Sequence, residues 1–389
     1  MKIGHYCPTI WAGGGIASYI RRISGEQRRL GHEVVFFDLI RFRDEARGAE
    51  DIPAFVEDAA GLFRQAADQG LDILHTHMVL PGRVRPSVPT IRTLHGHQPY
   101  CPSGSRFLPR QGKPCDRNYS VLGCTWGHLM DHCGSVRPAN LIADFRATRT
   151  ERETLHAIPT VTVSRLLKQQ MVRAGYREEL IHVLHLPAPD VKATMPPPQG
   201  GVPRFVFLGR ITPPKGVAWL LQAVREVRAP IHLDIAGEGY AEPEMRRLAA
   251  RLGLEDRVTF HGWVSGERIN ALLAQSRALV FPSIWHEPGG TVAFEAMVNG
   301  RGVIMSQVGG MPEVITEGVN GMLVEPNDVD GLARALECLA QDWPLAQRLG
   351  EAGRRAAPES FSLRGHVEAL MDLYTLHGAA APVPATLAG

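Results

Sequence analysis

Two glutamates, Glu287 and Glu295, flank a turn in the stretch FPSIWHEPGGTVAFEAMVNG, residues 281–300. The apolar run at 278–281 predicts a buried strand that ends at Pro282, and residues 291–298 predict a helix that begins after Gly289–Gly290. The first N–H groups of such a helix are unpaired and carry the positive end of its dipole, which suits a phosphate. A diphosphate between two carboxylates that bind hydroxyl groups describes a nucleotide sugar. The alternative is a plain turn at a helix start with two solvated glutamates.

Two cations follow the strand predicted at 204–208, in the sequence GRITPPKG. Arg210 and Lys215 are therefore expected at the carboxyl edge of a sheet. An arginine fork and a lysine ammonium can neutralise a diphosphate there. Taken alone, they are as well explained as solvated loop residues. The turn at 289–290, expected at the same edge, favours the phosphate interpretation.

The next two predicted strands, 231–236 and 258–260, end in AGEGY and HGWV. Gly237 permits close approach of the backbone, which a bound ligand can require. Trp263, with Val264 beside it, can lie near a nucleobase or belong to the core.

Histidines follow two buried runs in the first half of the chain, 71–75 and 91–94. His77 comes after the first run, and His95 and His97 come after the second. Side chains at the carboxyl ends of parallel strands line the ligand crevice of an open sheet. A histidine there can bond a sugar hydroxyl or carry a proton, or can simply be a satisfied polar group. We expect a role for His95 first and for His77 second.

The chain opens with a strand at 2–6, the glycines GGG at 13–15, a helix at 16–30 and a strand at 34–39. This order is typical of a doubly wound α/β fold. The backbones of Gly14 and Gly15 can approach a ligand, or they can form a tight turn only. The three glycines are contiguous, so they do not match the dinucleotide-binding fingerprint, and a dehydrogenase is disfavoured.

The length of 389 residues favours two domains. Prolines concentrate between 187 and 203, and the strand–helix pattern restarts at 204. A helix is also expected at 52–69. We therefore expect a first domain at 1–190, a linker at 191–203 and a second domain at 204–365. A terminal helix and disordered tail at 366–389 can pack back on the first domain.

The composition, 44% hydrophobic and 21% charged, is that of a soluble globular protein. A net charge of +2 gives no reason to expect a nucleic-acid partner. The sequence contains no apolar run of membrane-spanning length and begins without the pattern of a signal peptide, so we expect a cytoplasmic protein. Basic residues on the helices at 16–30 and 164–174 are solvated faces, or they contact anionic lipid at the inner face of the membrane.

The segment 98–137 lacks periodicity and carries Cys101, Cys115, Cys124 and Cys133. No Cys-x-x-Cys pair is present, so the spacing favours no metal. An irregular zinc site with His128 and His132 is an alternative, as are free buried thiols and a redox-sensitive disulfide. Long loops are usually functional, and this one follows His95 directly, so we expect it on the acceptor side of the cleft.

In their order and spacing, these motifs resemble glycosyltransferase family 4, the retaining transferases of the GT-B fold. The motifs are GGG at 13–15, TLHG at 93–96, GRITPPKG at 209–216, AGEG at 236–239, FHGWV at 260–264, EPGGTVAFEAM at 287–297 and VGGMPEVI at 308–315. The resemblance implies two doubly wound Rossmann-like domains facing each other across a cleft.

The resemblance also implies roles for the residues. Arg210 and Lys215 would hold the donor diphosphate, with N–H contacts from Gly290 and Thr291. Glu287 would bind the donor sugar and Glu295 the ribose, and His95 would lie beside the transferred sugar. Gly289 departs from the family pattern, which often has a bulky apolar residue there.

The implied reaction is transfer of a sugar, with retention, from a UDP- or GDP-type donor to a hydroxyl of a glycan, lipid-linked or small-molecule acceptor. Charge develops on the leaving diphosphate, and the cations with the helix end would take the place of a metal. No cofactor or catalytic metal is expected. An epimerase of similar build and a non-catalytic sensor of nucleotide sugars are the alternatives.

Overall fold

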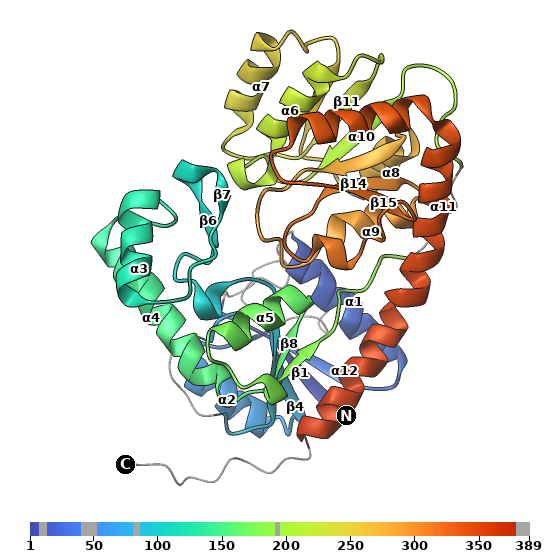
Figure 1. Cartoon of the computed structure of the whole chain (residues 1–389). Helices are drawn as coiled ribbons and strands as arrows, with labels where there is room; N and C mark the ends of the chain where they lie inside the picture. The colour runs from blue at the N-terminus through green and yellow to red at the C-terminus, as the bar shows by residue number, and fades with distance from the viewer. Residues whose placement is uncertain (8–13, 40–52, 81–85, 191–194, 379–389) are drawn as a thin grey trace.

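The chain folds into two parallel sheets with helices on both faces, one sheet in each half (Figure 1). The structure is a computed structural model, which describes residues 1–7, 14–39, 53–80, 86–190 and 195–378. The first sheet has the order β3-β2-β1-β4-β5-β8-β9. Its strands are β1 Lys2–Tyr6, β2 Glu33–Asp38, β3 Ala54–Phe55, β4 Ile73–Thr76, β5 Thr90–Leu94, β8 Thr160–Thr162 and β9 Ile181–Val183.

The second sheet has the order β12-β11-β10-β13-β14-β15. Its strands are β10 Arg204–Leu208, β11 His232–Ala236, β12 Val258–Gly262, β13 Ala278–Phe281, β14 Gly302–Ser306 and β15 Gly321–Val324. The paired strands in both sheets run parallel, so the carboxyl ends within each sheet share one edge. The GT-B architecture expected from the sequence, with two Rossmann-like domains facing a cleft, is confirmed.

The helices cover the sheets because their apolar faces match the buried strands. In β13 every residue is buried, and most of the helix after it is buried as well. The helices are α1 Gly15–Arg29, α2 Ala59–Asp68, α3 Val121–Trp126, α4 Pro138–Leu155, α5 Arg165–Arg173, α6 Val217–Glu226, α7 Glu242–Arg251, α8 Gly266–Ala274, α9 Thr291–Val298, α10 Val329–Gln341, α11 Trp343–Ser360 and α12 Leu363–Gly378.

Helix α12 returns from the second domain to the first, where it lies beside α1 (Figure 1). Val367, Leu370 and Tyr374 are buried in one cluster with Tyr19 and Ile20 of α1. The end of the chain therefore completes the core of the first domain, although the strand–helix pattern preceding it belongs to the second.

Three local predictions differ from the structure. The helix expected at 52–69 begins only at Ala59, because the Asp58 side chain accepts the Gly61 N–H and caps it there. Helix α4 was not expected, since it buries few side chains and its polar and apolar residues show no clear periodicity. The segment 98–137, expected to be irregular, contains α3, short turns and a hairpin of β6 Phe107–Leu108 and β7 Lys113–Pro114.

Some predictions fall on residues that the structure does not describe. They are the first glycine of the GGG motif, part of the linker, and the tail at 379–389. Among the described helices, none is long and apolar enough to cross a membrane.

Candidate functional site

A cleft of about 570 Å³ opens where the carboxyl edges of the two sheets meet. Both domains line it, through the loops that follow β1, β5, β10 and β13. The sequence-predicted residues that line it are Gly15, His95, Arg210, Lys215, Glu287, Gly289, Thr291 and Glu295. Residues far apart in the chain therefore meet at one site.

Glu287 and Lys215 form an ion pair on the second-domain wall of the cleft. Lys215 Nζ lies 2.5 Å from Glu287 Oε1, and the two side chains are only 12% and 7% exposed. The Ser283 hydroxyl donates to the same carboxylate oxygen at 2.8 Å. An ammonium has three N–H donors, so Lys215 can hold Glu287 and still bind an anion. Arg210, exposed on the same wall, adds a second positive charge.

The turn before α9 combines a packed glycine with one that faces the cleft. A Cβ on Gly290 would lie 3.1 Å from Met305 Cε, so this residue packs inward and does not line the cleft. Gly289 lines the cleft, and a Cβ there would lie 3.6 Å from Val163 of the first domain. The Thr291 N–H donates to the Gly289 carbonyl at 2.9 Å. The predicted phosphate contact of the Thr291 N–H therefore requires this hydrogen bond to break.

Four other predicted donor-binding residues stand outside the cleft lining. A Cβ on Gly237 would lie 1.9 Å from the Gly209 carbonyl oxygen, so this glycine permits two loops of the protein to approach each other. Trp263 is 71% exposed, and its neighbour Val264 packs on the second-domain core. Gly14 has a φ of 133°, a conformation that favours glycine, directly before α1.

A chain of imidazoles runs from the first-domain core to the cleft. His5 Nε2 lies 2.8 Å from Gln27 Oε1, which can only accept, so that nitrogen donates. His5 Nδ1 then accepts from His77 Nε2 at 3.0 Å. His77 Nδ1 in turn accepts from His95 Nε2 at 3.4 Å. The Gln27 carboxamide therefore assigns the tautomer of His95 and leaves its Nδ1 as the acceptor.

These histidines are neutral because they are buried. Burial is the main cause that lowers the pKa of His95 to about 3, with the nearby Arg92 charge adding to it. Burial likewise lowers the pKa of His5 to about 4 and that of His77 well below its ordinary value. His77 itself does not line the cleft but supports His95 from behind.

His97 bridges the two domains and does not line the cleft. Its Nε2 donates to the His286 carbonyl at 2.8 Å, and its Nδ1 accepts from the Tyr100 hydroxyl at 2.7 Å. Glu287, the residue that follows His286 in the chain, lines the cleft. His97 therefore positions the loop that carries this glutamate.

Sequence reasoning missed Tyr19, Arg22 and Trp285, all of which line the cleft. Arg22 was expected on a solvated or lipid-facing surface. Its guanidinium instead donates to the carbonyls of Pro187, at 3.0 Å, and Ala188, so it does not support the membrane contact. No local signal distinguishes Arg22 from the other arginines of α1, because its partners come from the distant segment after β9.

Glu313, within the VGGMPEVI motif, joins the domains away from the cleft. Its carboxylate accepts the backbone N–H groups of Arg165 and Leu166 at 2.7 and 2.9 Å, at the start of α5. His185 Nε2 lies 2.9 Å from the same carboxylate. Burial would raise the pKa of Glu313, but these hydrogen bonds outweigh it and lower the pKa.

Two family models match the chain. Residues 196–356 match "Glycosyl transferases group 1", and residues 13–192 match "Glycosyltransferase Family 4". The two matches together cover both domains and the cleft between them.

Curated relatives match part of the chain. An uncharacterized glycosyltransferase of Methanocaldococcus jannaschii is 31% identical over 174 residues, 44% of this chain and 44% of that protein. A D-inositol 3-phosphate glycosyltransferase of Streptomyces griseus is 36% identical over 182 residues, 44% of this chain and 38% of that protein. The chain thus spans less than half the length of these relatives.

Solved structures share the fold over nearly the full length. A sucrose-phosphate synthase of Thermosynechococcus elongatus has a TM-score of 0.74 at 19% identity, over 98% of this chain and 100% of that one. HepE of Anabaena, in complex with UDP-glucose, has a TM-score of 0.69 at 18% identity, over 97% of this chain and 100% of that one. At these identities the likeness establishes the fold alone.

Proposed function

We propose a function on the premise that the chain belongs to glycosyltransferase family 4, as its match to two family models shows. The protein transfers a sugar from a nucleoside-diphosphate donor to a hydroxyl of an acceptor, with retention at the anomeric carbon. The observation that carries the proposal is the single cleft where Lys215, Glu287, Glu295 and His95 meet. The matched families describe glycosyl transfer, so the epimerase alternative is not favoured.

The second-domain wall would bind the donor. Arg210 and the remaining N–H donors of Lys215 neutralise the diphosphate, and the start of α9 adds the positive end of a helix dipole. The two contacts described for Glu287 both use Oε1, so within the described part of the chain Oε2 remains to accept a sugar hydroxyl. Glu295, more than a turn into α9, would bind the ribose.

The two walls would stabilise opposite charges in the transition state. Negative charge develops on the leaving diphosphate, where Arg210 and Lys215 stabilise it. Positive charge develops at the anomeric carbon, beside which we place His95. Because His95 is neutral, it can accept a hydroxyl hydrogen bond at Nδ1 without repelling that carbon. The leaving phosphate takes the proton of the acceptor hydroxyl, so no protein nucleophile is needed.

The donor class is tested first. HepE, of the same fold, was solved with UDP-glucose, which supports uridine diphosphate sugars as the first candidates. The full chain should be screened by thermal shift against UDP, GDP and ADP and their sugars, because a ligand that binds the folded state raises Tm. Donors that bind are then incubated with glycan, lipid-linked and small-molecule acceptors. We expect acceptor-dependent release of the nucleoside diphosphate and a product that keeps the donor's anomeric configuration by NMR.

Three outcomes would contradict the proposal. A new nucleotide sugar formed without acceptor indicates an epimerase, and binding without turnover across the acceptor panel indicates a sensor. An inverted product excludes front-face displacement.

Metal independence has its own test. We expect equal turnover in chelator-treated buffer and in buffer with added magnesium or manganese, because cationic side chains and a helix end stabilise the leaving group. Turnover that is lost on chelation and restored by either ion, with Tm unchanged throughout, would contradict this part of the mechanism.

A further inference from the structure

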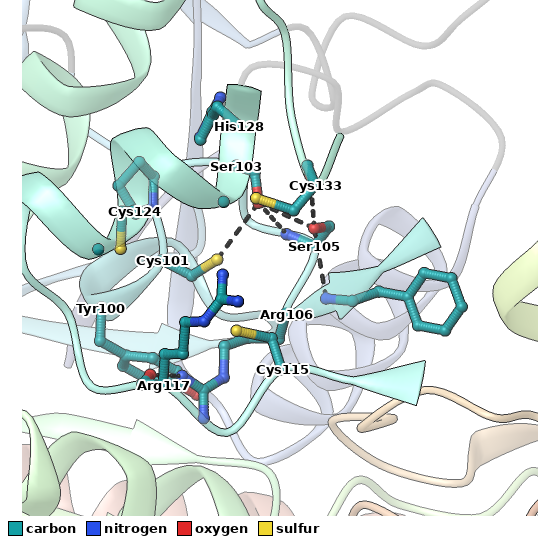
Figure 2. Close-up of a pocket in the computed structure, with 14 residues that line it drawn as sticks. Tyr100, Cys101, Ser103, Ser105, Arg106, Cys115, Arg117, Cys124, His128 and Cys133 are labelled. Carbon is teal, nitrogen blue, oxygen red and sulfur yellow. Dashed lines mark hydrogen bonds between the residues drawn. The ribbon is translucent and has the colours of Figure 1, made fainter. Parts of the chain in front are cut away.

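Four cysteines spread along residues 101–133 line a single small cavity in the first domain (Figure 2). Cys101 follows the 3-10 helix η2 Gln98–Tyr100, and Cys115 follows β7. Cys124 lies in α3, and Cys133 follows the single turn η4 Gly127–Asp131. All four are free thiols. Four short elements thus each contribute one sulfur to the same cavity.

The four sulfurs border one cavity, although no three of them lie within 4.8 Å of one another. In Figure 2 the sulfurs of Cys101, Cys115 and Cys133 border one space, with Cys124 at its side. The cavity volume of about 20 Å³ has room for one ion or one water.

Two arginines border the same cavity. Arg106 is only 4% exposed, and its Nε–H has no hydrogen-bond acceptor among the described residues. Arg117 pairs with Asp131, with Nη1 and Oδ2 2.6 Å apart. Four thiolates around a divalent cation leave a net negative charge, which the Arg106 guanidinium offsets in part because Arg117 is already neutralised by Asp131. The Arg106 Nε–H could also donate a hydrogen bond to a metal-bound thiolate, a contact that commonly orients metal ligands.

Apolar packing holds only part of this segment: Phe107 and Leu108 of β6 are buried, whereas the stretch around Cys124 is not. Helix α3 has no buried residue, and its Val121, Leu122 and Trp126 are all exposed. The hairpin strands β6 and β7 are two residues each. A metal ion would therefore help to order α3, which has no core of its own.

We propose that the thiolates of Cys101, Cys115, Cys124 and Cys133 bind one structural zinc ion. Zinc prefers four sulfur ligands in tetrahedral geometry, and each thiol releases its proton to solvent on binding. The binding must draw the sulfurs inward, since no three of them meet the 4.8 Å mutual spacing that the described histidine group meets. Cys124 lies on a six-residue helix, and the other three cysteines lie in loops between short elements.

Other candidate ligands are less suitable. His5, His75 and His77 form that closer group, but their ring nitrogens already make hydrogen bonds, including those of the imidazole chain. His132 is exposed and outside the cavity lining. His128 lines the cavity, and its Nδ1 donates to the Ser135 carbonyl at 3.0 Å, so its buried Nε2, which has no partner among the described residues, is the alternative ligand that the test below must exclude. The proposal departs from the sequence-based expectation of no metal in this segment.

The zinc site would also order a contact between the domains. Ser105 lies in the segment 98–137 that carries the four cysteines, and its carbonyl accepts the Trp285 indole N–H. Asp116 Oδ1 lies 2.9 Å from His286 Nε2. Trp285 and His286 directly precede Glu287 in the loop that enters the cleft. Loss of zinc should therefore loosen this loop as well as the segment.

The test is metal analysis of the full chain, purified without a polyhistidine tag. We expect about one zinc per chain by mass spectrometry of the metals. Cys101→Ser, Cys115→Ser, Cys124→Ser and Cys133→Ser should each lose most of the zinc and lower Tm. The matched control is Cys338→Ser, a partly exposed cysteine on α10 of the other domain, which should keep both.

A second measurement covers variants that fail to fold. Wild-type protein produced in cobalt-supplemented medium should show the intense visible bands of tetrahedral cobalt thiolate. The proposal is overturned by wild-type protein without bound metal, by disulfides between these cysteines in the mass spectrum, or by removal of zinc with Tm unchanged. Iron in place of zinc would overturn the assignment of the metal. Zinc loss in His128→Asn equal to that in the cysteine variants would overturn the all-thiolate ligand set.

Discussion

The two walls of the cleft differ in charge. The second-domain wall is charged, with Arg210 and the Lys215–Glu287 pair at the ends of β10 and β13. The first-domain wall is neutral at His95, because burial keeps His95 and the imidazole chain behind it unprotonated. Arg22 also lines this wall, where its guanidinium donates to the carbonyls of Pro187 and Ala188. The difference suits a reaction in which an anion leaves from one side and a cationic carbon forms on the other. A protonated imidazole at His95 would destabilise that carbon.

The largest effect is expected on the charged wall. Lys215→Ala should reduce kcat/KM roughly 30- to 1,000-fold, because the leaving diphosphate loses a fixed cation. This fall corresponds to about 2–4 kcal/mol of lost transition-state stabilisation. The control is Lys168→Ala, whose partner is the exposed Glu178 and which does not line the cleft. Steady-state kinetics with a saturating acceptor measure the change.

Lys215→Ala also leaves Glu287 buried without its ion partner. Comparison with the double variant that also carries Glu287→Gln separates the effect of this unpaired carboxylate from the effect of losing the diphosphate contact. Rates that stay unchanged in Lys215→Ala would remove the charged wall from the mechanism.

The second prediction is that Glu287 binds the sugar of the donor and Glu295 binds its ribose. Glu295→Ala should weaken both the free nucleoside diphosphate and the full donor by about 1–3 kcal/mol, since buried polar groups go unpaired. Glu287→Ala should leave affinity for the free nucleoside diphosphate nearly intact and depress turnover. Calorimetric titration of both variants with both ligands measures the difference. Equal weakening of the plain nucleoside diphosphate by the two changes would show that the division is wrong.

The third prediction tests the neutral wall through pH. The pKa of His95 is about 3 in the folded protein, against 6.5 ordinarily. The unfolded chain therefore binds the proton first, so stability is fully present above the ordinary pKa and is lost as pH falls toward the folded one. At about pH 5, each such histidine should lower the unfolding free energy by on the order of 2 kcal/mol. Urea unfolding of wild type and His95→Asn at about pH 7 and pH 5 measures this contribution.

His95→Asn should lose less stability over that interval than the wild type does. The exposed variant His132→Asn serves as the control and should behave as wild type. If His95→Asn and wild type lose the same amount, His95 is not held neutral by the fold.

The smallest effect is expected from Gln27, two imidazoles behind His95. Gln27→Leu removes the acceptor that assigns the tautomers along the chain, so kcat should fall by a factor corresponding to about 1 kcal/mol. The donor KM should not change, because Gln27 does not line the cleft. The control is Gln65→Leu on α2, whose amide donates to the Phe55 carbonyl. A donor KM that rises along with the fall in kcat would indicate a general packing defect.

Sequence patterns predicted the second domain most accurately. The strands at 204–208 and 278–281 and the helix at 291–298 match the structure residue for residue. Each is a local feature, in which a buried apolar run is ended by glycine or proline and a helix starts at a turn. Because parallel strands end at one edge, the same local patterns also placed Arg210, Lys215 and Glu287 in one cleft.

Tertiary structure alone decided how distant residues meet. His5 and His77 touch because β1 pairs with β4, and Gln27 reaches His5 from α1. The spacing of the four cysteines indicated no metal, yet the fold brings them to one cavity. The sequence allowed a terminal helix to pack back on the first domain, and the fold determines that α12 does so against α1. Periodicity and turn chemistry act between near neighbours in the chain, whereas these contacts depend on strand order and on where the chain returns.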